Sequence, residues 1–240
     1  MRLICADIPV ALFGSELEQR AEFERSNIPS IVMRCIQEVD ARGKVSEKIV
    51  RALDADALNI GMDIEGIYRK SGSASQVQVI KDGFERNNDY DISDPDLDIN
   101  AVTSCLKQYF RKLPTPLITY DVYNKLLETT TYHQTHEVDP SHPAHPSNPN
   151  HNTYRLNNIR LAINDLPPRH KDTLEVLIFH LARVIENERD NLMTSLNTAV
   201  VFAPTIMRPE SLAREMQDTQ AKNAAIQFMI ENCQTIFMAE

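Results

Sequence analysis

The sequence predicts an all-α protein, a single-domain bundle of many helices. Apolar residues recur every three or four positions through most of the chain, which is the spacing of one helix face. No segment shows a convincing alternation of apolar and polar residues, the pattern of a half-buried strand. Glycine is also scarce, with 6 in 240 residues, and 42% of the residues are hydrophobic. A chain of this size and composition can bury a substantial core.

The first half of the chain divides into short amphipathic segments. A charged run over residues 16–25 is expected to form a solvated helix that leads into the fold. Pro29 then opens a helix, since proline is favoured in the first turn, and we expect Gly43 to end it. Residues 44–60 have the apolar spacing of another short helix, and residues 73–86 have that of a third.

The segment over residues 98–113 has the most regular pattern. Its apolar residues share one helix face: Val102, Cys105, Leu106, Tyr109, Phe110 and Leu113. Lys107 and Arg111 lie four residues apart and off that face, so two cations are expected one turn from each other. They are either binding residues or ordinary solubilising cations. Pro114 and Pro116 end the helix, because proline disfavours helix in the residue before it.

The second half of the chain resumes helical spacing after an interruption. Helices are expected over residues 120–130, 156–166, 169–188 and 220–237, and residues 193–204 are largely apolar. Between the first two of these, residues 133–151 contain four prolines and five of the seven histidines. This segment has almost nothing apolar to bury, so we expect a disordered surface loop. Its proline-broken spacing lacks the geometry of a metal site, and no metal is expected there.

Charge and composition narrow the classes of function. A formal net charge of −9 argues against nucleic-acid binding, which requires concentrated positive charge. The four cysteines are far apart and are interpreted as reduced thiols rather than a disulfide framework or zinc site. The longest apolar runs are far shorter than the roughly 20 residues that cross a bilayer. Residues 1–14 lack the long apolar region of a signal peptide, so a cytoplasmic location is the default expectation.

A loop rich in glycine presents the candidate functional arginine, Arg69. Three glycines fall within twelve residues here: Gly61, Gly66 and Gly72. The backbone is therefore expected to turn sharply where it presents Arg69. A guanidinium on such a loop offers reach, fixed charge and planar donors to an oxyanion. The alternative is a surface arginine that pairs with a carboxylate such as Asp63 or Glu65.

Asn197 is a second candidate because it lies two residues before an apolar run at residues 199–202. A polar side chain in this position needs hydrogen-bond partners if it is buried. The alternatives to a binding role are a helix cap and a satisfied interior amide.

Six short motifs follow one another along the chain. They are Phe13-Gly14, Ile28-Pro29, residues 63–72 (DIEGIYRKSG), residues 106–117 (LKQYFRKLPTPL), Leu166-Pro167, and the stretch from Asn191 through Asn197 to Pro204. Their types and their order resemble the GTPase-activating domain of Rho-family regulators, the RhoGAP family. The resemblance covers residues 12–238, nearly the whole chain.

The resemblance implies an activator of a Rho, Rac or Cdc42-type small GTPase in its GTP-bound state. Arg69 would be the arginine finger, inserted in trans into the nucleotide site of the partner. Lys107 and Arg111 would help form the GTPase-binding surface and support the finger loop, and Asn197 would contact the switch region of the partner. No cofactor, metal or independent catalytic activity is expected of the chain itself, because GTP and Mg²⁺ belong to the partner.

The domain is expected to span residues 12–238, preceded by a lead segment of residues 1–11 and interrupted by two insertions. One insertion is the histidine-rich and proline-rich segment at 133–151. The other, residues 43–60, separates two parts of a motif that are contiguous in the family. It is either a genuine extra helix or translated intron, since its ends can be encoded by splice-site sequences. A transcript that always retains the segment would contradict the intron hypothesis.

Two other functions stay open at this point. The chain could be a catalytically silent GTPase-binding module of the same fold, or a scaffold whose segment 133–151 recruits other proteins. Retention of Arg69 between glycines favours the activator. Lys112, Thr115 and Ala203 depart from the usual residues of the family, but none of them is an implied site residue. Regions outside the chain could attach it to a membrane or to the cytoskeleton.

Overall fold

The structure is a computed structural model that describes residues 11–50, 61–87, 90–135, 139–211 and 213–238. Over these residues the chain forms helices and no strand, so the predicted all-α class is confirmed. The helices are α1 (Leu17–Phe23), α2 (Ser30–Val50), α3 (Ala74–Arg86), α4 (Ile99–Lys112), α5 (Tyr120–Thr135), α6 (His151–Asn164), α7 (Pro168–Glu186), α8 (Glu188–Asn191), α9 (Ser195–Ile206), α10 (Ala213–Gln217), α11 (Thr219–Glu231) and α12 (Cys233–Phe237), with a 3-10 turn η1 (Gly61–Asp63).

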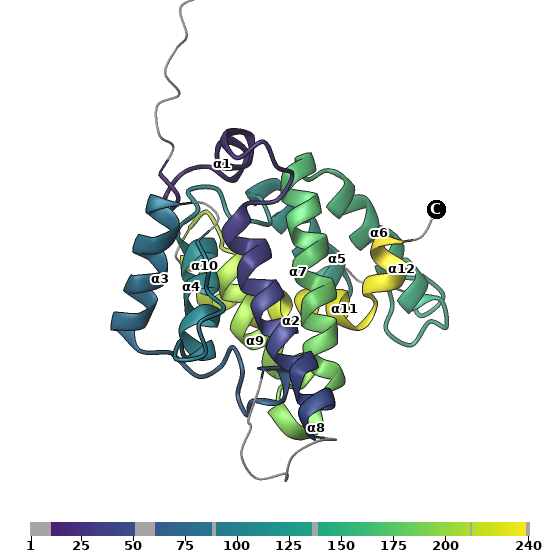
Figure 1. The fold of residues 1–240 in the computed structure, drawn as a ribbon. Helices are drawn as coiled ribbons and strands as arrows, with labels where there is room; N and C mark the ends of the chain where they lie inside the picture. Colours follow the sequence, from purple (N-terminus) through teal and green to yellow (C-terminus); the bar gives the residue numbers. More distant parts are fainter. Residues whose placement is uncertain (1–10, 51–60, 88–89, 136–138, 212, 239–240) are drawn as a thin grey trace, which may run out of the picture.

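Helix α7 lies at the centre of the bundle, next to α2 (Figure 1). It contacts α1, α2, α9, α11 and α12. Its predicted apolar stripe is buried on these neighbours: Leu174, Leu177, Ile178 and Leu181 are fully buried, and Ile185 is partly buried. The hydrophobic effect on this stripe therefore holds helices from both ends of the chain around one core.

Helix α4 packs against α2, α3 and α9 with the face that the sequence predicts. The Asp98 carboxylate caps its first turn by accepting a hydrogen bond from the Asn100 N–H, 2.9 Å away. Tyr109 and Phe110 are among the largest buried side chains. Cys35, Cys105 and Cys233 are buried free thiols, as expected, whereas Cys5 lies outside the described residues.

The predicted end of a helix at Gly43 is wrong, because α2 continues to Val50. Glycine inside a helix costs about 1 kcal/mol relative to alanine, which a long helix can tolerate. The Arg42 side chain holds this region by donating to the carbonyls of Leu97 (2.7 Å) and Asp94 (3.0 Å). The rest of the predicted extra helix, residues 51–60, lies outside the described residues. The predicted last helix is divided into α11 and α12.

The predicted disorder of segment 133–151 is wrong for residues 139–150, which form successive turns before α6 begins at His151. The cause is a repeat of three residues with proline in second place. The N–H of the first residue of each repeat donates to the carbonyl of the first residue of the preceding repeat. Examples are His142 to Asp139 (2.8 Å) and His145 to His142 (2.9 Å). Proline sets the backbone angle that the second position of such turns requires. Local hydrogen bonds thus order a segment that buries little apolar surface.

Candidate functional site

The loop that carries Arg69 connects η1 to α3 and closes in a tight turn. The Gly66 carbonyl accepts hydrogen bonds from the N–H groups of Arg69 (2.9 Å) and Lys70 (2.8 Å). Gly66 and Tyr68 both have left-handed backbone angles, with φ of +73° and +67°. Glycine adopts this region freely, but for tyrosine it costs about 1–2 kcal/mol, which other contacts of Tyr68 must offset. As a result, Tyr68 is buried and Arg69 is exposed.

A chain of hydrogen bonds anchors the Tyr68 side chain in the core. The Tyr68 hydroxyl lies 2.5 Å from Nε2 of His180 on α7. Nδ1 of His180 lies 2.7 Å from a carboxylate oxygen of Asp40 on α2, and Arg183 donates to the other oxygen at 2.6 Å. The Tyr68 ring also meets Phe202 of α9 edge to face, with centroids 5.0 Å apart. Three helices thus fix the residue that precedes Arg69.

The protonation states of this chain follow from burial and charge. Burial lowers the pKa of His180, so the imidazole is neutral at neutral pH. Partial burial acts to raise the pKa of Asp40, but hydrogen bonds from His180 and Arg183 lower it overall. Burial raises the pKa of the Tyr68 hydroxyl, which therefore stays protonated. Nδ1–H of His180 accordingly donates to Asp40, and its Nε2 accepts from Tyr68.

Lys107 holds the main chain of the same tyrosine. Although Lys107 lies off the apolar face predicted for α4, it is 6% exposed and its ammonium donates to the Tyr68 carbonyl. The loop that carries Arg69 covers that side of α4, which the spacing within α4 does not reveal. Burial, together with the nearby Arg111, lowers the pKa of Lys107 to about 8. The reading of Lys107 as a solubilising cation is therefore excluded.

Arg111 lies one helical turn after Lys107 and remains exposed, as predicted. Its Nε donates to Thr205 Oγ1 of α9 at 3.2 Å, so the side chain is oriented along the α4 and α9 surface. Arg69 is exposed as well. Its side chain makes no hydrogen bond or ion pair with any residue that the structure describes, whereas the adjacent Lys70 pairs with Glu65 at 3.4 Å.

Two asparagines hold the start of α9 next to the loop that carries Arg69. Asn191 is fully buried, and its amide donates to the carbonyls of Met62 and Val184, both at 2.8 Å. The main-chain carbonyl of Asn191 accepts a hydrogen bond from the Gly66 N–H at 2.7 Å. Asn197 is half-buried and donates to the Leu192 carbonyl at 3.1 Å. The sequence predicts a role for Asn197 but none for Asn191, although a polar residue at a helix junction is a recognisable signal.

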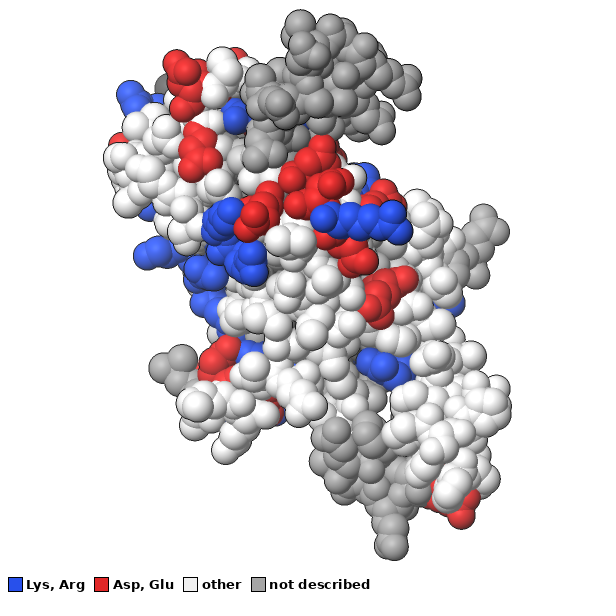
Figure 2. Space-filling view, turned by 90° about the horizontal axis from the view of Figure 1, so that it is seen from below, with Lys and Arg blue, Asp and Glu red and all other residues white. Residues whose placement is uncertain are grey.

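Charge is unevenly distributed over this end of the molecule. Figure 2 views the α8 end and shows lysine and arginine side chains gathered on one flank, beside a group of acidic side chains. The chain as a whole is acidic, with a formal net charge of −9. A local basic surface on an acidic body suits an anionic target on a protein partner better than nucleic acid.

Comparison with known proteins identifies the family. The family model for the RhoGAP domain matches residues 49–211. The chain belongs to the RhoGAP family. Beta-chimaerin from Mus musculus is 35% identical to this RhoGAP domain over 213 residues, which cover 87% of the chain and 54% of beta-chimaerin. Probable Rho-type GTPase-activating protein 4 from Schizosaccharomyces pombe is 34% identical over 88% of the chain, but the match spans only 18% of that protein.

Solved RhoGAP structures share the fold. Human Rho GTPase activating protein 15 matches 99% of this chain and 100% of its own, with a TM-score of 0.76 and 26% identity. The BH domain from GRAF, a GTPase regulator associated with focal adhesion kinase, matches 88% of this chain and 94% of its own, with a TM-score of 0.66 and 28% identity. The predicted family and architecture are therefore confirmed.

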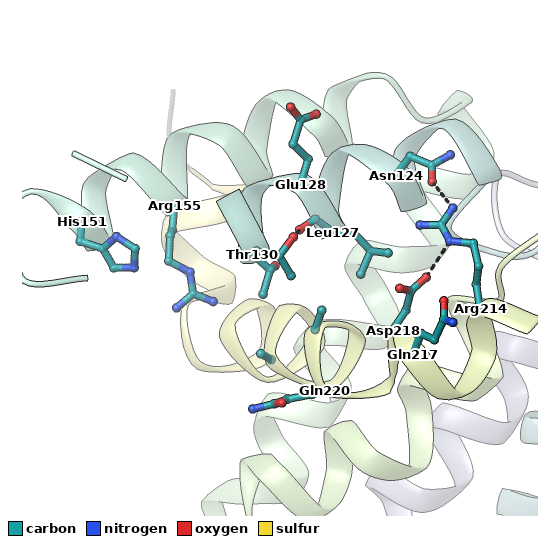
Figure 3. Close-up of a pocket in the computed structure, with 13 residues that line it drawn as sticks. Asn124, Leu127, Glu128, Thr130, His151, Arg155, Arg214, Gln217, Asp218 and Gln220 are labelled. Carbon is teal, nitrogen blue, oxygen red and sulfur yellow. Dashed lines mark hydrogen bonds and ion pairs between the residues drawn. The ribbon is translucent and has the colours of Figure 1, made fainter. Parts of the chain in front are cut away.

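The RhoGAP domain also has a cavity of about 590 Å³ between α5, α6, α10 and α11 (Figure 3). On one side Arg214 bridges Asn124 (2.9 Å) and Asp218 (3.1 Å). On the other side, the Arg155 guanidinium lies 4.1 Å from the centroid of the Phe228 ring. The cavity lining includes no residue of the finger loop, α4 or α9. It is therefore separate from the arrangement around Arg69.

Neither a metal centre nor a membrane span is found in the described part of this RhoGAP domain. Its histidine, cysteine and acidic side chains form no cluster of three or more that could hold a metal ion. None of its helices combines the length and the apolar character that a membrane crossing requires.

Proposed function

We propose that this RhoGAP domain accelerates GTP hydrolysis by a Rho-family small GTPase in its GTP-bound state, with Arg69 as an arginine finger supplied in trans. The observation that carries the proposal is the contrast between Tyr68 and Arg69. Tyr68 is buried and held at both its hydroxyl and its carbonyl, whereas the next side chain is exposed and has no partner among the described residues. A rigid anchor thus presents a free guanidinium to solvent.

The chemistry of phosphoryl transfer explains the need for such a guanidinium. Negative charge is redistributed over phosphate oxygens as the γ-phosphoryl group separates, and catalysis consists mainly of positioning and electrostatic stabilisation. Planar donors on a fixed positive charge suit those oxygens. A preorganised loop adds to the effect, since little conformational freedom is lost when the finger enters the site. The nucleotide and its Mg²⁺ would be supplied by the GTPase, so the domain needs no cofactor.

Lys107, Arg111 and Asn197 have distinct parts in this proposal. Lys107 would act from within, by fixing the Tyr68 carbonyl. Asn197 lies in the first turn of α9, and Arg111 lies on α4 beside Thr205 near the end of α9. Both would contact the partner. The relatives of similar sequence are named as Rho-type or Rho GTPase-activating proteins, which supports a GTPase of that class as the partner.

The test is single-turnover GTP hydrolysis by a panel of purified Rho, Rac and Cdc42-type GTPases. The parent domain should accelerate hydrolysis by at least one of them. Arg69→Ala should lose on the order of 10³-fold or more of that acceleration while it still binds the GTPase. The Arg69→Lys variant should also accelerate hydrolysis only weakly, because an ammonium lacks the planar donors of a guanidinium.

Arg86→Ala is the matched control, since Arg86 is also an exposed arginine but ends α3. It should activate as the parent does. Binding by the parent domain without acceleration of any GTPase would contradict the proposal and would favour a catalytically silent GTPase-binding module. Equal activity of the Arg69→Ala variant would contradict the finger mechanism alone.

A further inference from the structure

The cavity between α5, α6, α10 and α11 contains an arginine that no described residue pairs with. Arg155 is partly buried, and its side chain extends from α6 into the cavity (Figure 3). Its guanidinium lies over the Phe228 ring but makes no hydrogen bond or ion pair with any residue that the structure describes. Burial lowers the pKa of Arg155, although a guanidinium stays charged. Because a partly buried charge without a partner is unfavourable, the arrangement points to an anion from outside the chain.

The carboxylates around Arg155 are bonded elsewhere or directed away from it. Asp218 pairs with Arg214 at 3.1 Å on the other side of the cavity. Glu231 acts on Arg155 through its charge, but its Oε1 already accepts hydrogen bonds from two other side chains, at 2.6 Å and 2.9 Å. Glu128 is exposed, and Figure 3 shows its carboxylate directed away from Arg155. None of these three groups therefore serves as the partner of the guanidinium.

Phe228 stabilises the guanidinium without using any of its hydrogen-bond donors. A cation over an aromatic face is attracted by the electrons of the ring, and this contact consumes no N–H group. The N–H donors of Arg155 are therefore available to a ligand. A carboxylate can accept two parallel hydrogen bonds from a guanidinium, and such charge-assisted bonds are stronger than neutral ones.

The other charges of the cavity lining favour a ligand with a single negative charge. The described lining contains two arginines, Arg155 and Arg214, and two carboxylates, Glu128 and Asp218. Because Arg214 and Asp218 pair with each other, Glu128 is left to oppose any excess of negative charge in the ligand. A dianionic phosphate is therefore a poorer fit to this cavity than a carboxylate.

Two glutamines and a small apolar surface complete the lining. Gln217 and Gln220 are exposed, and their side chains make no hydrogen bond with any residue that the structure describes. Each side-chain amide offers donors and an acceptor, as a peptide group does. Leu127, Ala221 and Ala224 add apolar surface, and the volume of about 590 Å³ lies within the range of ligand sites in proteins. These features suit a short peptide better than a bare carboxylate.

We propose that this cavity binds an acidic peptide segment, which places a glutamate or aspartate side chain against Arg155 and pairs its main chain with Gln217 and Gln220. The carboxylate of the peptide supplies the anion that the described residues do not. The cavity includes no residue of the loop that carries Arg69, so the inference does not depend on the proposed function. The domain would then hold a protein segment at one site and present Arg69 at another.

The test uses the whole chain and two pools of short peptides that are blocked at both ends. One pool has glutamate fixed at the centre and the other positions varied, and the matched pool has glutamine at the centre. The Nε–H signal of Arg155 in proton–nitrogen NMR spectra reports directly on the guanidinium, and the Arg155→Lys variant assigns this signal by its loss. The glutamate pool at about millimolar concentration should shift the signal, with an apparent affinity at least tenfold above that of the glutamine pool.

Variants then test the two parts of the proposed site. Arg155→Lys keeps a positive charge near Phe228 but lacks the planar donors, so peptide affinity should fall at least tenfold. Arg86→Lys is the matched control, because Arg86 is an exposed arginine at the end of α3, which does not line the cavity. It should bind the glutamate pool as the parent does. The double variant Gln217→Ala, Gln220→Ala changes only exposed side chains and should weaken binding about threefold.

Each outcome decides for or against the peptide site. A preference for the glutamate pool that is lost in Arg155→Lys and kept in Arg86→Lys supports it. No shift of the Arg155 signal with either pool overturns it, and equal shifts with both pools overturn the role of the carboxylate. Binding of N-acetylglutamate as tight as that of the glutamate pool overturns the peptide assignment, because the cavity would then be a site for small organic carboxylates.

Discussion

The Tyr68 hydroxyl and His180 Nε2, 2.5 Å apart, join the loop that carries Arg69 to the central helix α7. The two residues are separated by 112 positions in the chain. Because His180 is also bonded to Asp40 of α2, the contact ties the position of Arg69 to the packing of two core helices. The proposed role of Arg69 therefore depends on hydrogen bonds between side chains in the core.

Tyr68→Phe tests the strength of that link. The change leaves Nε2 of His180 buried without a donor, which should lower the free energy of unfolding by about 1–3 kcal/mol. Tyr109→Phe is the control, since the Tyr109 hydroxyl is buried and has no hydrogen-bond partner among the described residues. It should be neutral or slightly stabilising. Urea denaturation measures both, and equal losses would mean that ring packing, rather than the hydrogen bond, makes Tyr68 important.

His180 should make stability sensitive to acid. Its pKa in the folded protein is lowered from the usual 6.5, so the unfolded chain binds the proton more readily. Stability is therefore lost as the pH falls through about 6.5. The groups that face the ring are the Asp40 carboxylate, the Tyr68 hydroxyl and, through Asp40, the Arg183 guanidinium.

His180→Gln isolates this contribution. The variant should be less stable than the parent at pH 7.5, but it should lose less additional stability between pH 7.5 and 5.5. Urea denaturation at both values gives the difference, because the other ionisable groups are common to the two proteins. Parallel losses in parent and variant would refute a role of His180 in acid sensitivity.

Because of Lys107, the free energy of unfolding should rise with pH in the alkaline range, whereas activation of the GTPase should decline. Its pKa of about 8, against 10.5 in a solvated lysine, means that the folded protein loses this proton first. Between these values the unfolded chain binds more protons, so stability should rise with pH. Activation of the GTPase should decline around pH 8, because the neutral amine donates a weaker hydrogen bond to the Tyr68 carbonyl.

Lys107→Arg provides the comparison, since a guanidinium stays charged throughout this range. Single-turnover activation should be measured from pH 7 to 9.5, with the intrinsic hydrolysis of the GTPase subtracted at each pH. The variant should show no decline near pH 8. A decline that is the same in both proteins would belong to the GTPase and would count against Lys107.

The sequence predicts well whatever depends on local spacing. The core face of α4 and the stripe of α7 follow from apolar residues at helical intervals, because burial of one face is what stabilises each helix. The exposed Arg69 follows from glycines that permit a tight turn. In each case the cause lies within a few residues of the feature.

The connections between distant segments were not predictable in this way. Lys107 is buried by a loop almost 40 residues earlier in the chain, which the pattern of α4 cannot show. The chain from Tyr68 through His180 to Asp40 joins three separate elements. One signal was present: His180 lies at a core position between Ile178 and Leu181, and a polar residue there requires buried partners.

Gly72 fixes the other end of the Arg69 loop against α4, and its substitution should disturb the site by steric contact. A Cβ atom at Gly72 would lie 2.2 Å from the backbone nitrogen of Ala101, and backbone cannot move aside as a side chain can. The Gly72 N–H also donates to Ser104 Oγ at 3.1 Å. Gly72→Ala should therefore push the loop from α4, with a loss of about 1–3 kcal/mol in the free energy of unfolding.

Gly14→Ala separates steric contact from backbone freedom. Gly14 has a φ of +89°, but a Cβ atom there would meet nothing within 4 Å. Both variants should be less stable in urea, and Gly14→Ala should lose only about 1 kcal/mol from its backbone angle. Only Gly72→Ala should reduce the maximal rate of GTPase activation, because it alone shifts Tyr68 relative to Lys107. Full activation of the GTPase by a folded Gly72→Ala variant would show that Arg69 acts without the close contact between Gly72 and α4.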